Sequence, residues 1–339
     1  NSVRERAGLI PISDFIKIRN NNNMRIAFLG TPEFAVPSLK MLIEQGHEIE
    51  VFTQPDRPRD RGHGLAMPPV KAAALEAGIA VHQFERIKNE EGVRALKDFA
   101  PELMVTAAFG QILSRENLEI PKYGCINVHG SLLPKYRGAS PVQSAIINGE
   151  KVTGVTTMLT DIGMDTGDML LQHETKIGEN ETYGELYSRL AVIGAETLRE
   201  TIERLADGTL PRTKQDDALA TKCAKIKKED ACIDFSKSSQ RIHDLVRGLN
   251  PEPCAFAMLS GQKIKIISTR LVPDEKQNQI LQNASVCGEC VIADSKRGLF
   301  VRTGDGVTEI TELQFPNSKR MNAKAALNSK KMLGCIFNG

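Results

Sequence analysis

Residues 25–30 read Arg25-Ile26-Ala27-Phe28-Leu29-Gly30, a short apolar run that ends in glycine. Such a run is typical of a strand that is buried on both faces of a parallel sheet. Apolar residues at helical spacing follow over 34–45, and a second apolar run occupies 48–53. A strand, a helix and a second strand in this order form a right-handed crossover unit, so we expect the fold to begin as a doubly wound α/β sheet.

The same alternation continues to about residue 210. We therefore expect residues 24–210 to form one mostly parallel, doubly wound sheet with helices on both of its faces. The predicted helices lie at 70–77, 89–99, 142–147 and 181–205, the predicted strands lie at 79–82, 103–107 and 124–129, and 153–159 with 168–174 alternate like a hairpin.

The pattern changes after Pro211. Residues 211–235 are polar and charged, which favours a linker, and residues 236–339 hold short strands separated by glycine- or aspartate-containing turns. Five close strands indicate a small OB-like barrel, a shape often used on nucleic acid. Its strands are predicted at 255–259, 263–270, 284–293, 298–303 and 307–315, with helical segments at 238–249 and 323–327.

The composition is that of a folded protein. The chain has 339 residues, of which 41% are hydrophobic and 25% charged, which excludes a disordered chain. No apolar run approaches the roughly 18 residues that a membrane helix needs. The net charge of +2 conceals an asymmetry, because residues 1–210 carry 23 Lys and Arg against 28 Asp and Glu, whereas residues 211–339 carry 21 against 14. A basic C-terminal region of this kind suggests a polyanionic partner.

The cysteines and the first residues indicate the setting. The chain has seven cysteines, an odd number, and no signal-peptide pattern precedes them, so we expect reduced thiols in a cytoplasmic protein. We also expect the protein to be a monomer and to have no membrane partner. Cys287 and Cys290 form a single CxxC pair; zinc sites normally need a second pair, so a turn holding two thiols is favoured over a redox or metal role. Residues 1–23 are expected to be a leader or an added segment outside the fold, because Met24 directly precedes the first strand.

The first loop lacks the features of a nicotinamide site. Residues 30–34 follow a strand and open a helix, which is where a dinucleotide fingerprint would stand. The loop has one glycine, Gly30, instead of three, so the backbone cannot approach a pyrophosphate in the usual way. This argues against an NAD-dependent oxidoreductase.

The chemistry is concentrated around residues 124–134. Asn127 and His129 alternate along the predicted strand, so both side chains leave the same face near its carboxyl end. Residues 160–169 add three acids and two glycines. An amide donor, an imidazole and a carboxylate suit attack of an amine on a carbonyl carbon, by direct transfer because no nucleophile elbow is present. The alternative is that Asn127 and His129 have a purely structural role and only cap the strand end.

Two motifs carry a family resemblance. Asn127-Val128-His129-Gly130-Ser131-Leu132-Leu133-Pro134, together with residues 161–168, resembles the signature of the folate-dependent formyltransferases. The similarity runs from about Met24 to the C-terminus and is strongest to the branch that acts on initiator methionyl-tRNA. The similarity includes residues 30–32, 54–58, 124–127 and 304–306, and that branch is indicated by the first two of these and by the long C-terminal region.

The resemblance implies a co-substrate and a set of site residues. It implies 10-formyltetrahydrofolate as the formyl donor, no metal, and Asn127, His129 and Asp165 as the catalytic residues. Asn127 and His129 would stabilise an oxyanion, and Asp165 would keep His129 charged or move protons. The residues implied in folate binding are Ser131, Leu132, Leu133, Pro134, Phe109, Gly110, Ile112 and Asp161.

The resemblance also implies a tRNA surface. The loop 54–71 is similar to one that enters the acceptor end of the tRNA, although His63-Gly64 stands where relatives often carry lysines. The chain has no Trp, and residues 250–253 lack an aromatic between the prolines, so backbone electrostatics should dominate over base stacking. The expected tRNA-binding residues are Arg57, Arg59, Arg61, Lys71, Lys225, Lys227 and Lys263.

Two other functions stay open at this point. A formyltransferase acting on an amino sugar nucleotide would share the catalytic residues and a C-terminal barrel, but it would not need the basic loop. A non-catalytic tRNA-binding module would not need Asn127, His129 and Asp165.

Overall fold

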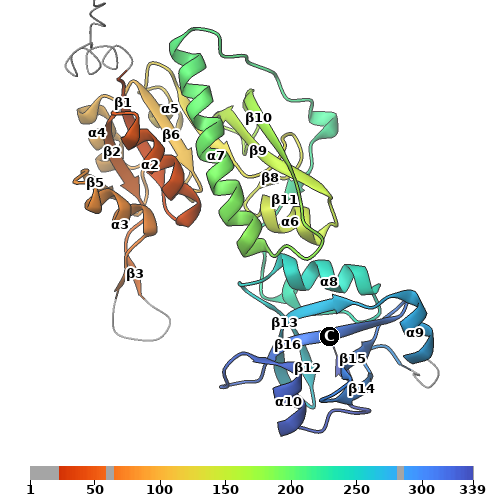
Figure 1. Cartoon of the computed structure of the whole chain (residues 1–339). Helices are drawn as coiled ribbons and strands as arrows, with labels where there is room; N and C mark the ends of the chain where they lie inside the picture. Colours follow the sequence, from red (N-terminus) through yellow and green to blue (C-terminus); the bar gives the residue numbers. More distant parts are fainter. Residues whose placement is uncertain (1–22, 59–64, 281–285, 339) are drawn as a thin grey trace, which may run out of the picture.

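The computed structural model describes residues 23–58, 65–280 and 286–338. They form two lobes, an N-terminal lobe around a large sheet and a C-terminal lobe of short strands (Figure 1). Helix α8 (Ser239–Gly248) lies between the two lobes. No helix of the described residues is long and apolar enough to cross a membrane.

The N-terminal sheet has seven strands in the order β10-β9-β7-β6-β1-β2-β5. The five strands from β7 to β5 are parallel to their neighbours, and β9 and β10 are added antiparallel at one edge. The predicted mostly parallel sheet is therefore confirmed. Its strands are β1 (Arg25–Gly30), β2 (Glu48–Thr53), β5 (Val81–Gln83), β6 (Leu103–Ala107), β7 (Cys125–His129), β9 (Val152–Leu159) and β10 (Met169–Lys176).

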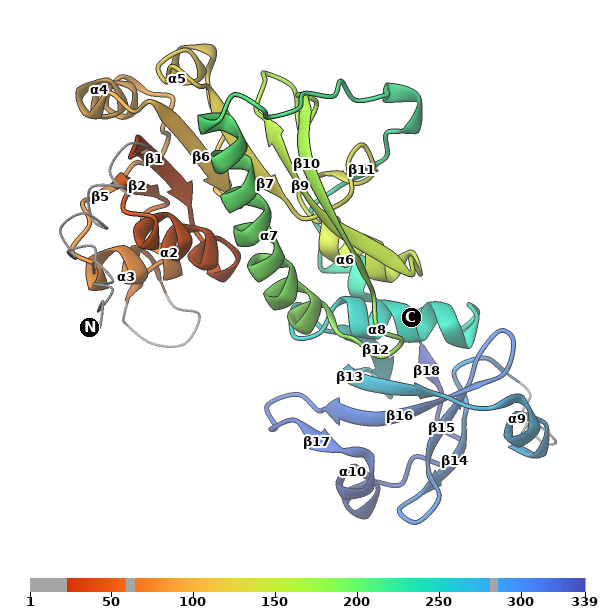
Figure 2. The ribbon, with the colours of Figure 1, turned by 45° about the horizontal axis from the view of Figure 1, so that its top comes forward.

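Helices cover both faces of this sheet because its strands are apolar on both sides. In β1, Ile26 and Phe28 join one hydrophobic cluster, whereas Ala27 and Leu29 join another on the opposite face. The first cluster is covered by η1 (Glu33–Ala35), α2 (Val36–Glu44), α3 (Pro69–Glu76) and the long helix α7 (Tyr183–Ala206), and the second by α4 (Glu90–Phe99) and α5 (Arg115–Leu118) (Figure 2).

The C-terminal lobe is a small antiparallel barrel, as predicted. Its strands run in the order β14-β15-β16-β13-β12-β18, and a bridge between Glu289 and Ile336 joins the two ends of this path. The short last strand was not anticipated from the sequence. The elements are β12 (Ala255–Leu259), β13 (Gln262–Leu271), α9 (Asp274–Ile280), β14 (Cys290–Asp294), β15 (Gly298–Arg302), β16 (Val307–Gln314), β17 (Met321–Asn322), α10 (Ala323–Ser329) and β18 (Phe337–Asn338).

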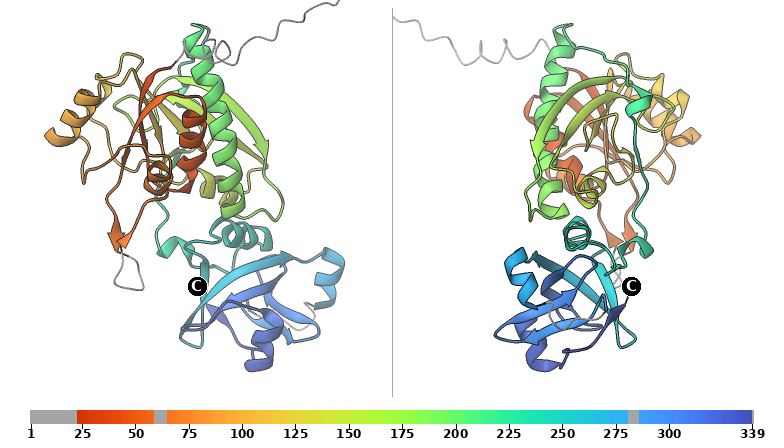
Figure 3. Two further views of the ribbon diagram at one scale, coloured as in Figure 1. Left: turned by 60° about the vertical axis from the view of Figure 1, so that its left-hand side comes forward. Right: turned by 90° about the vertical axis from the view of Figure 1, so that its right-hand side faces the viewer.

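The segment after α7 returns to the N-terminal lobe. We call residues 212–223 the strap. Thr213 bridges to Met169, and β11 (Lys222–Cys223) pairs in parallel with β8 (Arg137–Gly138). Residues that the sequence pattern assigns to a linker therefore lie along the loops that follow β7 and β9 (Figures 1 and 3).

Two further features relate the lobes. Helix α6 (Pro141–Ile147) packs on α8, where Arg241 Nη1 donates to the carbonyl of Ile147 at 2.9 Å. The hairpin of β3 (Arg57–Pro58) and β4 (Leu65–Ala66) projects from the sheet toward the level of the C-terminal lobe (Figure 3).

Candidate active site

Strand β7 presents two polar side chains on one face. Ile126 and Val128 point into the cluster beneath α7, so Asn127 and His129 lie on the opposite face, as the alternation predicts. Three segments from elsewhere approach this face: the loop after β7, the loop between β9 and β10, and the strap.

His129 is held between two oxygen acceptors. Its side chain is nearly buried, with 6% exposed, and Nε2 lies 3.0 Å from the carbonyl oxygen of Tyr136. Because a carbonyl only accepts, Nε2 must carry the proton. The other ring nitrogen, Nδ1, lies 3.7 Å from Asp165 Oδ2. At this distance the carboxylate faces the ring nitrogen without a direct hydrogen bond.

Asp165 has an unusual backbone that aims its carboxylate at this ring. Its φ is +55°, in the left-handed region, which costs a non-glycine residue about 1–2 kcal/mol. The conformation is held by neighbours: Oδ2 accepts from the Gly138 backbone N–H at 2.8 Å, and the Asp165 carbonyl accepts from Gln215 Nε2 at 2.8 Å. Asp165 therefore reaches His129 as part of a hydrogen-bonded loop.

Asn127 is oriented by a neighbouring strand. Its Oδ1 accepts a hydrogen bond of 2.9 Å from Thr106 Oγ1. This leaves the Nδ2 amide protons available, and within the described part of the chain no group accepts a hydrogen bond from them. An amide donor beside an imidazole is the arrangement that stabilises a developing oxyanion.

The predicted folate residues after β7 divide into two kinds. Ser131 and Leu133 are buried; Ser131 Oγ donates to the carbonyl of Lys135 at 2.6 Å, and the Leu133 N–H donates to Thr156 Oγ1 at 3.1 Å. These two side chains shape the loop from inside. Leu132 and Pro134 are half-buried.

The remaining predicted folate residues lie on two loops. Phe109 is buried, and its carbonyl accepts from Thr31 Oγ1 at 3.0 Å and from Gln54 Nε2 at 3.1 Å. Gly110 follows with φ +77°, and Ile112 is 72% exposed, so the end of this segment faces outward. Asp161 is exposed and accepts from the Thr166 hydroxyl at 2.7 Å, which ties together its own loop.

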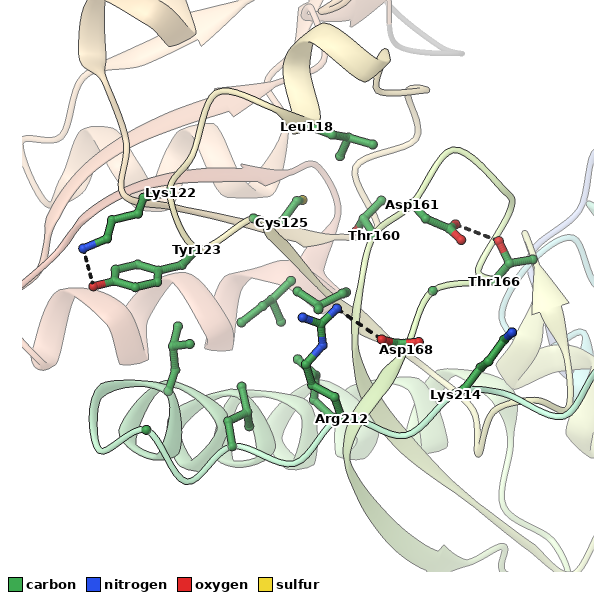
Figure 4. Close-up of a pocket in the computed structure, with 18 residues that line it drawn as sticks. Leu118, Lys122, Tyr123, Cys125, Thr160, Asp161, Thr166, Asp168, Arg212 and Lys214 are labelled. Atoms are coloured by element: carbon green, nitrogen blue, oxygen red, sulfur yellow. Dashed lines mark hydrogen bonds and ion pairs between the residues drawn. The ribbon is translucent and has the colours of Figure 1, made fainter.

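A cleft of about 710 Å³ opens near the start of β7. Figure 4 shows Leu118, Cys125, Thr160 and Asp161 around it, with the ion pair between Arg212 and Asp168 at 3.1 Å. The side chains that line it include Asp161 of the predicted folate residues but neither Asn127 nor His129. Burial raises the pKa of the Cys125 thiol to about 11, so Cys125 adds no charge to the cleft near neutral pH.

The predicted tRNA contacts differ in whether their charge is already paired. Arg57 pairs with Glu85 at 3.0 Å on the surface, and the Lys71 ammonium donates to Asp56 and to Gln83 Oε1, each at 2.8 Å. Lys225, Lys227 and Lys263 are exposed, and Lys263 Nζ lies 3.5 Å from the centre of the Phe256 ring. Arg59 and Arg61 lie outside the described residues.

Several residues of the site were not anticipated from the sequence. Thr106 could have been identified from the sequence, because it is the one hydroxyl residue in the apolar run 103–107. Arg137 and Gln215 could not have been identified in this way, since each is a polar residue in a polar segment. Among the described residues, no group of three or more His, Cys, Asp and Glu side chains is arranged to hold a metal ion.

Comparisons with known proteins agree with this architecture. The family model described as "Formyl transferase" matches residues 24–202, and the model described as "Formyl transferase, C-terminal domain" matches residues 225–331. Proteins named methionyl-tRNA formyltransferase match at 49% identity in Ruminiclostridium cellulolyticum and 48% in Acetivibrio thermocellus, each over 310 residues, 91% of this chain and 97% of the relative.

Solved structures share the fold at lower identity. The sugar 3N-formyl transferase WlaRD, solved with dTDP and 5-N-formyl-THF, superimposes with a TM-score of 0.62 at 22% identity, over 87% of this chain and 99% of that one. HypX from Aquifex aeolicus, solved with tetrahydrofolic acid, gives 0.61 at 16% identity over 91% of this chain and 47% of that one. With both family models matched in order along the sequence, the chain belongs to the formyl transferase family.

Proposed function

We propose that this chain transfers a formyl group from 10-formyltetrahydrofolate to the amino group of methionine on initiator tRNA, and so supports translation initiation. The observation that carries the chemistry is that Asn127 and His129 share one face of β7 and that Asp165 reaches the His129 ring from the loop between β9 and β10. The names of the relatives at 45–49% identity support the acceptor. We infer that it works in the cytoplasm as a monomer.

The first step is attack of the amine nitrogen on the formyl carbon. As the new C–N bond forms, the carbonyl π electrons move to the formyl oxygen, which becomes an oxyanion. Asn127 Nδ2 and protonated His129 Nδ1 are the donors proposed to stabilise that charge. Removing one such donor typically costs about 100- to 1,000-fold in kcat.

The second step breaks the bond between the formyl carbon and folate N10. The attacking nitrogen loses one proton and N10 gains one, so the reaction is balanced without an external acid. Asp165 is the proposed acceptor of the amine proton, and protonated His129 Nδ1 is the proposed donor of the proton to N10. Return of the proton from Asp165 to Nδ1, which it faces, then restores both groups. The products are the formylated aminoacyl-tRNA and tetrahydrofolate.

The proposed folate site lies beside these residues. We assign Gly110, Ile112, Leu132, Pro134 and Asp161 to its lining, because their side chains or backbone are at least partly exposed. We assign buried Ser131, Leu133 and Phe109 to supporting that lining from within.

The alternative acceptor is an amino sugar nucleotide. It is supported by a structural neighbour whose title names a sugar formyl transferase. The exposed lysines of the C-terminal region and the hairpin of β3 and β4 favour the larger, polyanionic tRNA over a small nucleotide.

The deciding experiment offers one formyl donor to several amines. The protein is incubated with 10-formyltetrahydrofolate and methionyl initiator tRNA, methionyl elongator tRNA, free methionine or an amino sugar nucleotide, and formylated product is measured by mass spectrometry. Product from the initiator tRNA with little from the others is expected. Preference for the sugar nucleotide would overturn the proposal. His129→Ala and Asp165→Ala should abolish transfer while a non-reactive formylfolate analogue still binds.

A further inference from the structure

We propose that Gln215 is a positioning residue for the transfer: it holds the backbone of Asp165 so that the carboxylate faces His129. This rests on the proposed function and adds to it a residue from the strap, 50 positions away from Asp165 in the sequence.

One end of the Gln215 amide binds the loop that carries Asp165. Gln215 is buried, with 6% exposed, and its Nε2 donates to the carbonyl of Asp165 and to the carbonyl of Gly167, each at 2.8 Å. Carbonyl oxygens only accept, so this orientation of the amide is fixed and both of its protons are used.

The other end of the same amide binds the loop that follows β7. Oε1 accepts from Arg137 Nε at 2.9 Å, and Arg137 is itself buried, with Nη2 donating to Asp217 at 2.8 Å. The next residue, Gly138, donates its backbone N–H to Asp165 Oδ2. Gln215 thus joins the two segments whose contact sets the direction of the carboxylate.

The backbone of Asp165 needs this support. Its φ of +55° is unfavourable for a residue with a side chain, and residues 161–164 before it are exposed. Without the two donors from Gln215, Asp165 can relax toward an ordinary φ, which turns its carboxylate away from Nδ1. A misplacement of about 1 Å is enough to cost about 100-fold in rate.

The test compares three variants of the full chain. Gln215→Met keeps the length of the side chain and removes all three hydrogen bonds, and Arg137→Lys keeps the charge near Asp217 but removes the Nε donor. Asp216→Asn is the control, because the neighbouring exposed side chain only caps the Ala218 N–H, which Asn also does. For each variant, kcat, both KM values and the urea unfolding midpoint are measured, with hydrogen exchange in peptides covering 136–140 and 161–168.

Gln215→Met is expected to lower kcat about 10- to 100-fold with each KM within about twofold, and to speed exchange of the Gly138 amide about tenfold. Arg137→Lys should show a smaller loss of the same kind, and Asp216→Asn should match the unmodified chain. A kcat within twofold of the unmodified chain, or losses in kcat and both KM values that parallel lost stability, would overturn the proposal. If the unmodified chain does not formylate methionyl-tRNA, the proposed function fails, and unchanged exchange at Gly138 would separately refute the role of Gln215.

Discussion

Thr106 on β6 and Asn127 on β7 are register partners on adjacent parallel strands, and the Thr106 hydroxyl donates to Asn127 Oδ1 at 2.9 Å. The bond decides which end of the amide faces the reacting groups. A carboxamide is nearly symmetric in shape, so without such a partner either its oxygen or its NH₂ group could occupy the donor position. Only the NH₂ group can stabilise an oxyanion.

Thr106→Val should therefore weaken catalysis without touching any substrate contact. Valine matches threonine in shape and suits a buried strand, but it lets the Asn127 amide rotate. We expect kcat to fall about tenfold, less than the loss on deleting an oxyanion donor, with KM for the tRNA unchanged. Steady-state formylation measures this. Thr106→Ser retains the hydroxyl and is the matched control; equal loss in both variants would mean that packing, not the amide, is responsible.

The sheet was predictable because each central strand is a short apolar run that can be recognised from its own sequence. The runs 25–30 and 103–107 are buried on both faces, and the structure places β1 and β6 at those same residues. The edge strand was less well placed: the pattern favoured 79–82, whereas β5 is Val81–Gln83, because a half-buried edge has weaker apolar periodicity. The period of a strand also predicted that Asn127 and His129 share a face.

The support of the site was not predictable in this way. The contacts of Gln215 with Asp165 and of Thr221 with Tyr136 span 50 and 85 positions. They join polar residues in loops, where no periodicity distinguishes a buried side chain from a solvated one. Such pairs are set by the topology of the chain, after the sheet has brought the loops together.

The strap makes close contact with the site at a glycine. Gly138 has φ +126°, and a Cβ there would collide with the Cys223 carbonyl of β11. Gly138→Ala should displace β11 and the donor to Asp165, so that unfolding occurs at lower urea and transfer falls at least tenfold. Gly208→Ala is the control, because its φ of +68° is also left-handed but nothing lies within 4 Å of the added Cβ. If both variants behaved alike, backbone strain alone would explain the result.

The buried thiol of Cys125 should make stability depend on alkaline pH. Burial raises its pKa from 9.0 to about 11, so the folded state disfavours the thiolate. This contribution is fully present below pH 9 and is lost as the pH rises toward 11, because the unfolded chain ionises first. Between pH 8 and 10.5, the unmodified chain should lose roughly 2 kcal/mol more unfolding free energy than Cys125→Ala.

Urea titrations of both proteins at the two pH values give this difference directly. Tyrosines and the other cysteines titrate in both chains and cancel in the comparison. Cys287→Ala, at an exposed position, should lose as much stability as the unmodified chain over this range. Parallel behaviour of Cys125→Ala and the unmodified chain would show that the Cys125 thiol ionises equally in both states.

The lysines expected to bind tRNA should differ in how much each contributes to the salt dependence of tRNA binding. Lys225, Lys227 and Lys263 are exposed, so each can take up a phosphate and release counterions. The charge of Lys71 is already paired with that of Asp56. The hydrogen bond from Lys71, and to a lesser extent the one from Gln83, lowers the pKa of the Asp56 carboxyl and keeps it ionised. A phosphate would have to displace that carboxylate.

We therefore expect Gln substitution at each exposed lysine that contacts the tRNA to flatten the slope of log K against log salt by about 0.7–0.9. Lys71→Gln should leave the slope nearly unchanged while altering the base of the hairpin that starts at Arg57. Fluorescence anisotropy with labelled initiator tRNA from 50 to 300 mM KCl measures both. Lys97→Gln is the control, because Lys97 lies on α4 and pairs with Glu116 of α5. A full unit of slope lost at Lys71 would mean that tRNA binding breaks its pairing with Asp56, which makes that ion pair part of the binding surface.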